Sequence, residues 1–123
     1  PADLARFPLL HDDMRDDWGV WMEAAGVDGI NVSRGPSFSH SYLVQQAAVA
    51  GEGVALGRSV LIVDDLAAGL LIRPFAIDLK AHHYYSAVYP KASAKRPKII
   101  AFRDWLVAEA KETEARFAAV IGQ

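Results

Sequence analysis

Three serine hydroxyls lie close together at Ser37, Ser39 and Ser41, directly before a run of residues with helical spacing. The first turn of a helix has unpaired backbone N–H groups and about half a positive charge. Such a helix start suits a carboxylate or a phosphate, and serine hydroxyls beside it can donate to the anion without adding charge. One serine, Ser39 or Ser41, suffices as the helix N-cap. The surplus predicts an anion-binding site, and ordinary capping remains the alternative.

A second candidate is the aromatic stretch "HHYYSAVY" at residues 82–89, whose composition is typical of a β-strand. Alternate residues of a strand face opposite sides of the sheet, so His83 and Tyr85 would share one face. The Tyr85 hydroxyl would add specificity beside an anion site, and a half-buried aromatic strand is the alternative. The neighbours His82 and His83 would point apart, and the chain has no cysteine. We therefore expect no metal ion and no other cofactor.

The other charged residues near the predicted strand ends suggest no catalytic apparatus. Arg34 and Arg58 each end a predicted strand or its following turn, where they could pair with an anionic ligand or lie as surface charges. The acidic run at residues 12–17 is expected to form a solvated loop and a helix cap. The serines do not fit the G-x-S-x-G turn of a hydrolase nucleophile. We expect a binding protein rather than an enzyme.

The elements that would position these groups alternate along the chain. Trp18, Trp21 and Met22 fall on one helical face and are expected in the core, and Gly26 suits the position after a helix end. Strands that alternate with helices predict a three-layer, Rossmann-like α/β lobe that binds its ligand at the carboxyl ends of the strands. The expected strands cover residues 8–13, 30–35, 53–57, 70–75 and 83–90. The expected helices cover residues 1–7, 16–25, 41–50 and 59–68, followed by a long helix from Pro97.

Composition limits the possible partners. The 123 residues are 52% hydrophobic and 23% charged, which suits one domain with a buried core. The formal net charge of -2 gives no electrostatic footprint for nucleic acid or an anionic membrane. The apolar runs are far shorter than a membrane span, and the first ten residues do not have the pattern of a signal peptide. These features favour a cytoplasmic protein with no membrane partner.

Several longer motifs, taken in their order, resemble a known family. They are "PLLH", "W…EAAG", "RGP.F", "QAAVAGEGVALG", "DDLAAGLLIRPF", "YP" and "AFRDWLVAEA", and they extend over residues 4–110. Their order and spacing are similar to those of the effector-binding domain of LysR-type transcriptional regulators. The resemblance is strongest to the branch that contains the glycine-cleavage activator and the β-lactamase regulator.

The resemblance implies a lobe of a type 2 periplasmic-binding-protein-like domain, in which a small metabolite, with a carboxylate as the expected anion, binds between two lobes. It places effector-binding positions at Phe38, Ser39, Ser41 and Tyr85. It divides the chain into an entry helix at residues 1–8, the second lobe at residues 9–89, and a crossover with a long C-terminal helix at residues 90–123. The helix-turn-helix domain and most of the first lobe of such a regulator would lie outside these 123 residues, so DNA would be bound only through that other domain. A lobe of a solute-binding transport protein is the alternative.

The long helix predicts a further contact surface. Ile99, Phe102, Leu106 and Ala110 share one helical face, which in this family packs on the first lobe. An exposed apolar stripe of this kind is an interaction surface. We expect the chain to self-associate through it, most simply as a two-fold dimer.

Overall fold

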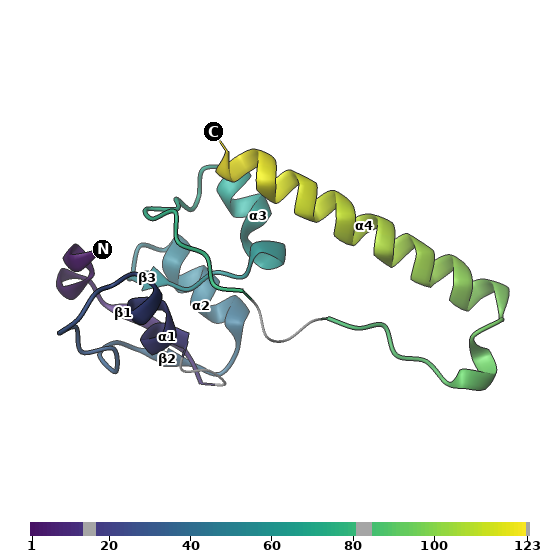
Figure 1. Cartoon of the computed structure of the whole chain (residues 1–123), viewed down its shortest axis with the longest axis horizontal. Helices are drawn as coiled ribbons and strands as arrows, with labels where there is room; N and C mark the ends of the chain where they lie inside the picture. Colours follow the sequence, from purple (N-terminus) through teal and green to yellow (C-terminus); the bar gives the residue numbers. More distant parts are fainter. Residues whose placement is uncertain (14–16, 81–84, 123) are drawn as a thin grey trace. The chain divides into compact units, whose positions relative to one another are not determined.

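The computed structural model describes residues 1–13, 17–80 and 85–122. The chain divides into two compact units, Pro1–Leu79 and Lys80–Gln123, and each is described here by itself. Figure 1 shows the elements in chain order. The first unit contains η1 (Ala2–Arg6), β1 (Leu9–Asp12), α1 (Asp17–Ala24), β2 (Ser37–Phe38), α2 (Ser41–Val49), β3 (Val54–Ala55) and α3 (Ser59–Ala67). The second contains η2 (Lys91–Ser93) and α4 (Pro97–Ile121).

The first unit is built on a short parallel sheet with the strand order β2-β1-β3. His11 and Asp12 pair with Ser37 and Phe38 on one side of β1, and Leu9 and Leu10 pair with Val54 and Ala55 on the other. Because all three strands are parallel, their carboxyl ends meet at one edge. The predicted α/β class is confirmed, and Asp12 and Ser37 lie at this edge.

Consecutive residues of β1 bury their side chains in two different cores, as strand alternation requires. Leu9 packs with Trp18, Trp21 and Met22 of α1, together with Leu4 of η1. Leu10 packs with Val44 and Ala47 of α2. The sheet therefore has a helix on each face, which is the three-layer arrangement expected from the sequence. The prediction that Trp18, Trp21 and Met22 are core residues is confirmed.

One glycine permits the central strand pairing. Gly35 has a φ of +135°, and a Cβ at this position would lie 1.9 Å from the carbonyl oxygen of Leu9. The backbone therefore passes directly against β1, and the carbonyl of Pro36 accepts a hydrogen bond from the His11 N–H at 3.0 Å. A residue with a side chain would push β2 away from β1.

Several boundary predictions are wrong. No strand forms at residues 30–35, because Asn31 Oδ1 accepts a hydrogen bond from the Ser33 N–H and turns the chain. The pairing segment is instead the shorter β2 that follows Pro36. The N-cap of α2 is His40, so neither Ser39 nor Ser41 is the cap, and Ser41 is the first helical residue. The shift of one residue releases the Ser41 hydroxyl for a partner outside its own helix.

Two further predicted strands are not found where the structure describes them. Residues 70 and 71 form a bend and residues 72–75 have no regular secondary structure, so this segment forms no ladder in the described parts of the chain. Phe75 and the nearby Ile77 pack against the α1 core. Of the predicted strand at residues 83–90, His83 and Tyr84 lie outside the described residues, as does His82, and residues 85–90 are not in a strand. Strand-like composition alone therefore does not place a segment in a sheet.

The second unit confirms the predicted long helix. Pro97 occupies its first turn, where the missing N–H costs no hydrogen bond. The helix continues through the polar residues 111–114 to Ile121. Hydrogen bonds to Asp104, and less strongly to Tyr89, raise the pKa of Arg103 above its ordinary value. The predicted domain boundaries at residues 9 and 90 stay a prediction.

Candidate functional site

The carboxyl edge of the sheet brings the serine cluster against the acidic residues at the end of β1, Asp12 and Asp13. Ser41 Oγ, at the start of α2, donates a hydrogen bond to Asp12 Oδ2 at 2.5 Å. Ser37 Oγ donates to Asp13 Oδ1. Ser39 Oγ lies 3.0 Å from Nδ1 of the adjacent His40. Two of the three hydroxyls are therefore directed at carboxylates of the chain itself.

Asp12 joins the ends of all three strands. Its carboxylate also forms an ion pair with the Arg58 guanidinium, whose Nη2 lies 3.5 Å from Asp12 Oδ2. The Asp12 side chain is 15% exposed and that of Arg58 is 33% exposed, so the pair is partly shielded from water. Asp12 ends β1, Ser41 follows β2, and Arg58 follows β3. At this edge the Ser41 hydroxyl and the Arg58 guanidinium therefore both bind the Asp12 carboxylate.

This arrangement differs from the acidic loop expected from the sequence. The carboxylate of Asp12 was expected in solvent, and it lies instead among Ser41 and Arg58. The sequence contained a signal for this placement, since Asp12 ends a buried strand and parallel strands bring their carboxyl ends together. The sequence left open whether Arg58 pairs with an anionic ligand or is a surface charge. In the structure Arg58 pairs with the carboxylate of Asp12.

The start of α2 leaves the predicted site open to solvent on one side. His40 is the N-cap residue and makes no side-chain capping hydrogen bond. Ser39 and His40 are exposed, whereas Ser41 is half-buried. The His40 and Tyr42 rings lie 5.9 Å apart in a tilted arrangement. A ligand that reached the first turn of α2 would therefore meet the Ser39 hydroxyl from the solvent side and the Ser41 hydroxyl from the sheet side.

The other two predicted effector-binding residues have different surroundings. Phe38 is half-buried and packs against the core formed by Leu10, Val44 and Ala47. Tyr85 belongs to the second unit, where it is 73% exposed. Phe38 adjoins the serines in the chain, and the contribution of Tyr85 beside them stays a prediction.

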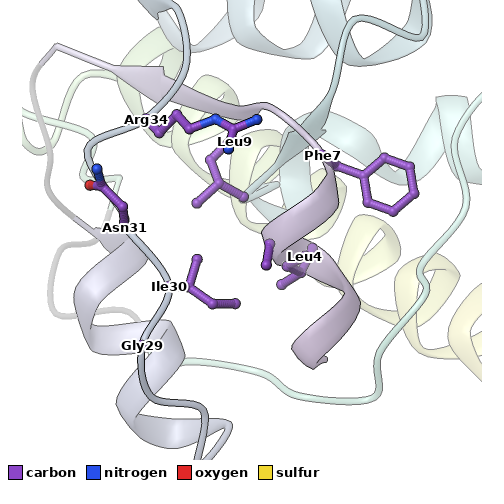
Figure 2. A pocket seen from close by; sticks show the side chains of 8 residues that line it. Leu4, Phe7, Leu9, Gly29, Ile30, Asn31 and Arg34 are labelled. Atoms are coloured by element: carbon purple, nitrogen blue, oxygen red, sulfur yellow. The ribbon is translucent and has the colours of Figure 1, made fainter.

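A different cavity lies at the opposite edge of the sheet. It has a volume of about 220 Å³ and is lined mainly by η1, the start of β1 and the loop before β2. In Figure 2 the side chains of Leu4, Leu9 and Ile30 line it, while Arg34 extends across one rim and the Phe7 ring points away. None of the four predicted effector-binding residues lines this cavity. It is open to solvent and is the rival location for a ligand in this unit.

The described residues contain no group of three or more His, Asp or Glu side chains that could hold a metal ion. His82 and His83 lie outside the described residues. Among the described helices, none is both long and apolar enough to cross a membrane.

Comparison with known proteins decides the family. The model of the LysR substrate-binding domain matches residues 1–111. The chain belongs to the LysR substrate-binding domain family. The resemblance predicted from the sequence is thereby confirmed, and the helix-sheet-helix layers described above are those of a LysR effector-binding lobe.

The relatives of this LysR domain are transcriptional regulators. It is 41% identical over 117 residues to the glycine cleavage system transcriptional activator of Escherichia coli K12, covering 95% of this chain and 38% of that protein. It is 34% identical over 112 residues to the transcriptional activator AmpR of Providencia stuartii, covering 91% of this chain and 38% of that protein. The chain therefore spans about two fifths of the length of these curated relatives. They are regulators and not enzymes, which confirms the non-enzyme prediction and disfavours the transport alternative.

A solved structure supports the same assignment of the LysR fold. The effector domain of the regulator AmpR of Pseudomonas aeruginosa matches with a TM-score of 0.68 and 28% sequence identity. The match covers 94% of this chain and 57% of that chain. The LysR domain described here thus shares its fold with an effector domain.

Proposed function

We propose that this LysR domain senses a small carboxylate-bearing metabolite, which binds at the carboxyl edge of the sheet against the start of α2. Ser39 and Ser41 would donate to the carboxylate, and Phe38 would form an apolar wall. The observation that carries the proposal is that Ser41 and Arg58 hold a carboxylate already, that of Asp12. These side chains have the chemistry and the spacing that such a ligand needs.

The ligand would act by selecting one conformation of a regulator. In a two-lobe effector domain, a metabolite that contacts both lobes favours the closed arrangement over the open one. We propose that such closure alters how a complete LysR-type regulator binds DNA through its helix-turn-helix domain, in the cytoplasm. The lobe described here would supply the hydroxyl and helix-start contacts of the cleft.

The experiment is a binding screen by amide NMR on the 123-residue chain. Small mono- and dicarboxylates are added to the ¹⁵N-labelled protein at constant ionic strength. The proposal predicts saturable shifts of the Ser39, Ser41 and Tyr42 amides for at least one carboxylate. Loss of a hydrogen bond to a charged group costs about 1.5–3 kcal/mol, so Ser41→Ala should weaken that ligand about 10- to 100-fold. Ligands that shift only residues around the Leu4–Ile30 cavity would contradict the proposal.

A further inference from the structure

The feature that the proposed function does not use is the carboxylate of Asp12. This carboxylate contacts the two groups that we expect to bind the ligand: its Oδ2 lies 2.5 Å from Ser41 Oγ and 3.5 Å from Arg58 Nη2. We propose that Asp12 is an internal competitor, whose carboxylate occupies the place of the ligand carboxylate and must release Arg58 when the ligand binds. This inference rests on the proposed function, because it concerns the same site.

The geometry supports displacement of the ion pair rather than simultaneous binding. Two carboxylates that converge on one hydroxyl and one guanidinium repel each other, and the partial burial of Asp12 reduces the screening of that repulsion. A guanidinium has five N–H donors, and Arg58 is one third exposed. Arg58 can therefore exchange one carboxylate for another without leaving its place at the start of α3.

This competition makes Asp12 a specificity-determining residue. A ligand that merely carries a negative charge must overcome both the repulsion from Asp12 and the loss of the Asp12–Arg58 ion pair. Only a ligand with additional contacts to the cleft would do so at low concentration. The simplest carboxylates would bind weakly to the native chain and more tightly once the competing charge is removed.

The test compares acetate binding to the chain and to Asp12→Asn by amide NMR at constant ionic strength. Asparagine keeps an acceptor for Ser41 and removes the charge. The inference predicts that acetate binds Asp12→Asn about tenfold more tightly than the native chain, with shifts at the Ser39 and Ser41 amides. The matched control is Asp13→Asn, which removes the same formal charge from the neighbouring residue that accepts from Ser37. Its acetate affinity should stay within about twofold of the native value.

Two outcomes separate this inference from the function on which it rests. If acetate shifts the serine amides equally well in the native chain and in Asp12→Asn, the competitor role is wrong and the anion site stands. If acetate shifts these amides in neither protein, both the competitor and the anion site are wrong. An equal gain in Asp12→Asn and Asp13→Asn would also refute the competitor, because it would show only a general charge effect.

A measurement on the native chain covers the case in which Asp12→Asn does not fold. The Asp12 side-chain carboxyl and the Arg58 Nε–H signals are followed through the acetate titration. The inference predicts that both shift with the same midpoint as the Ser41 amide, because one event breaks the ion pair and fills the site. An unchanged Asp12 carboxyl signal at saturating acetate would overturn it.

Discussion

Replacing Ser41 by alanine removes the hydroxyl that donates to the partly buried Asp12 carboxylate. Hydrogen bonds to charged groups contribute about 1.5–3 kcal/mol to stability. Asp12 keeps its ion pair with Arg58 after the substitution, and Ser41 is only half-buried, so we expect a loss near the lower limit, about 1–2 kcal/mol. A domain with about 5–15 kcal/mol of stability stays folded after this loss, and the variant remains usable in binding experiments.

The matched control is Ser39→Ala, two residues earlier. Its hydroxyl is exposed and its contact is with the adjacent His40 ring, so its removal should change stability by less than about 0.5 kcal/mol. Urea unfolding followed by tryptophan fluorescence measures both, because Trp18 and Trp21 are buried in the core of this unit. We expect a lower urea midpoint for Ser41→Ala at an unchanged slope. Equal midpoints for the two variants would refute the structural role of the Ser41–Asp12 contact.

Three other predictions follow from packing. Leu10→Ala should lower the free energy of unfolding by about 2–5 kcal/mol in the same urea experiment, because the Leu10 side chain of β1 is 2% exposed and packs against α2. A loss below about 1 kcal/mol would show that Leu10 and α2 do not form a core on this face of the sheet. Gly35→Ala should lower the free energy of unfolding by more than about 3 kcal/mol, because the new Cβ would clash with the Leu9 carbonyl oxygen. Gly51→Ala, which places its Cβ in open space, should lower it by only about 1 kcal/mol. The helix α4 is described along its whole length and buries no residue. We therefore expect light scattering at micromolar concentration to show a dimer for the native chain and a monomer for Leu106→Glu. A monomer mass for the native chain would rule out self-association through α4.

The helices could be predicted from the sequence because their signals are local. The apolar spacing of Trp18, Trp21 and Met22 defines the buried face of α1, and Pro97 marks the first turn of α4. The helix end before Gly26 was also predictable, and Gly26 has the positive φ that glycine adopts most readily. The resemblance to the LysR family rested on motifs spread along the chain, and it was confirmed.

The strands were less predictable because a strand needs a neighbour. Residues 71–77 alternate between half-buried and exposed, as a strand does, yet they form no ladder in the described parts of the chain. The pairing of β2 depends on the close backbone approach at Gly35, which composition does not reveal. Residues 30–35 had the composition of a strand, and a local hydrogen bond from Ser33 to Asn31 turned them into a loop.

The serine cluster was located from the sequence, but its partners were not. Helix propensity and capping rules place Ser41 at a helix start, and they do not show that the Asp12 carboxylate lies against it. That contact joins residues 29 positions apart and exists only because the parallel strands bring their ends together. The Arg58–Asp12 ion pair has the same origin.

We expect a carboxylate ligand to bind at the carboxyl edge of the sheet, at the start of α2. A crystal structure of the chain grown with saturating acetate, or with a carboxylate identified in the NMR screen, tests it most directly. We expect carboxylate density within hydrogen-bond distance of Ser41 Oγ and the Arg58 guanidinium, with the Asp12 carboxylate moved away from Arg58. Density in the cavity lined by Leu4 and Ile30 instead, with the Asp12–Arg58 ion pair intact, would contradict it.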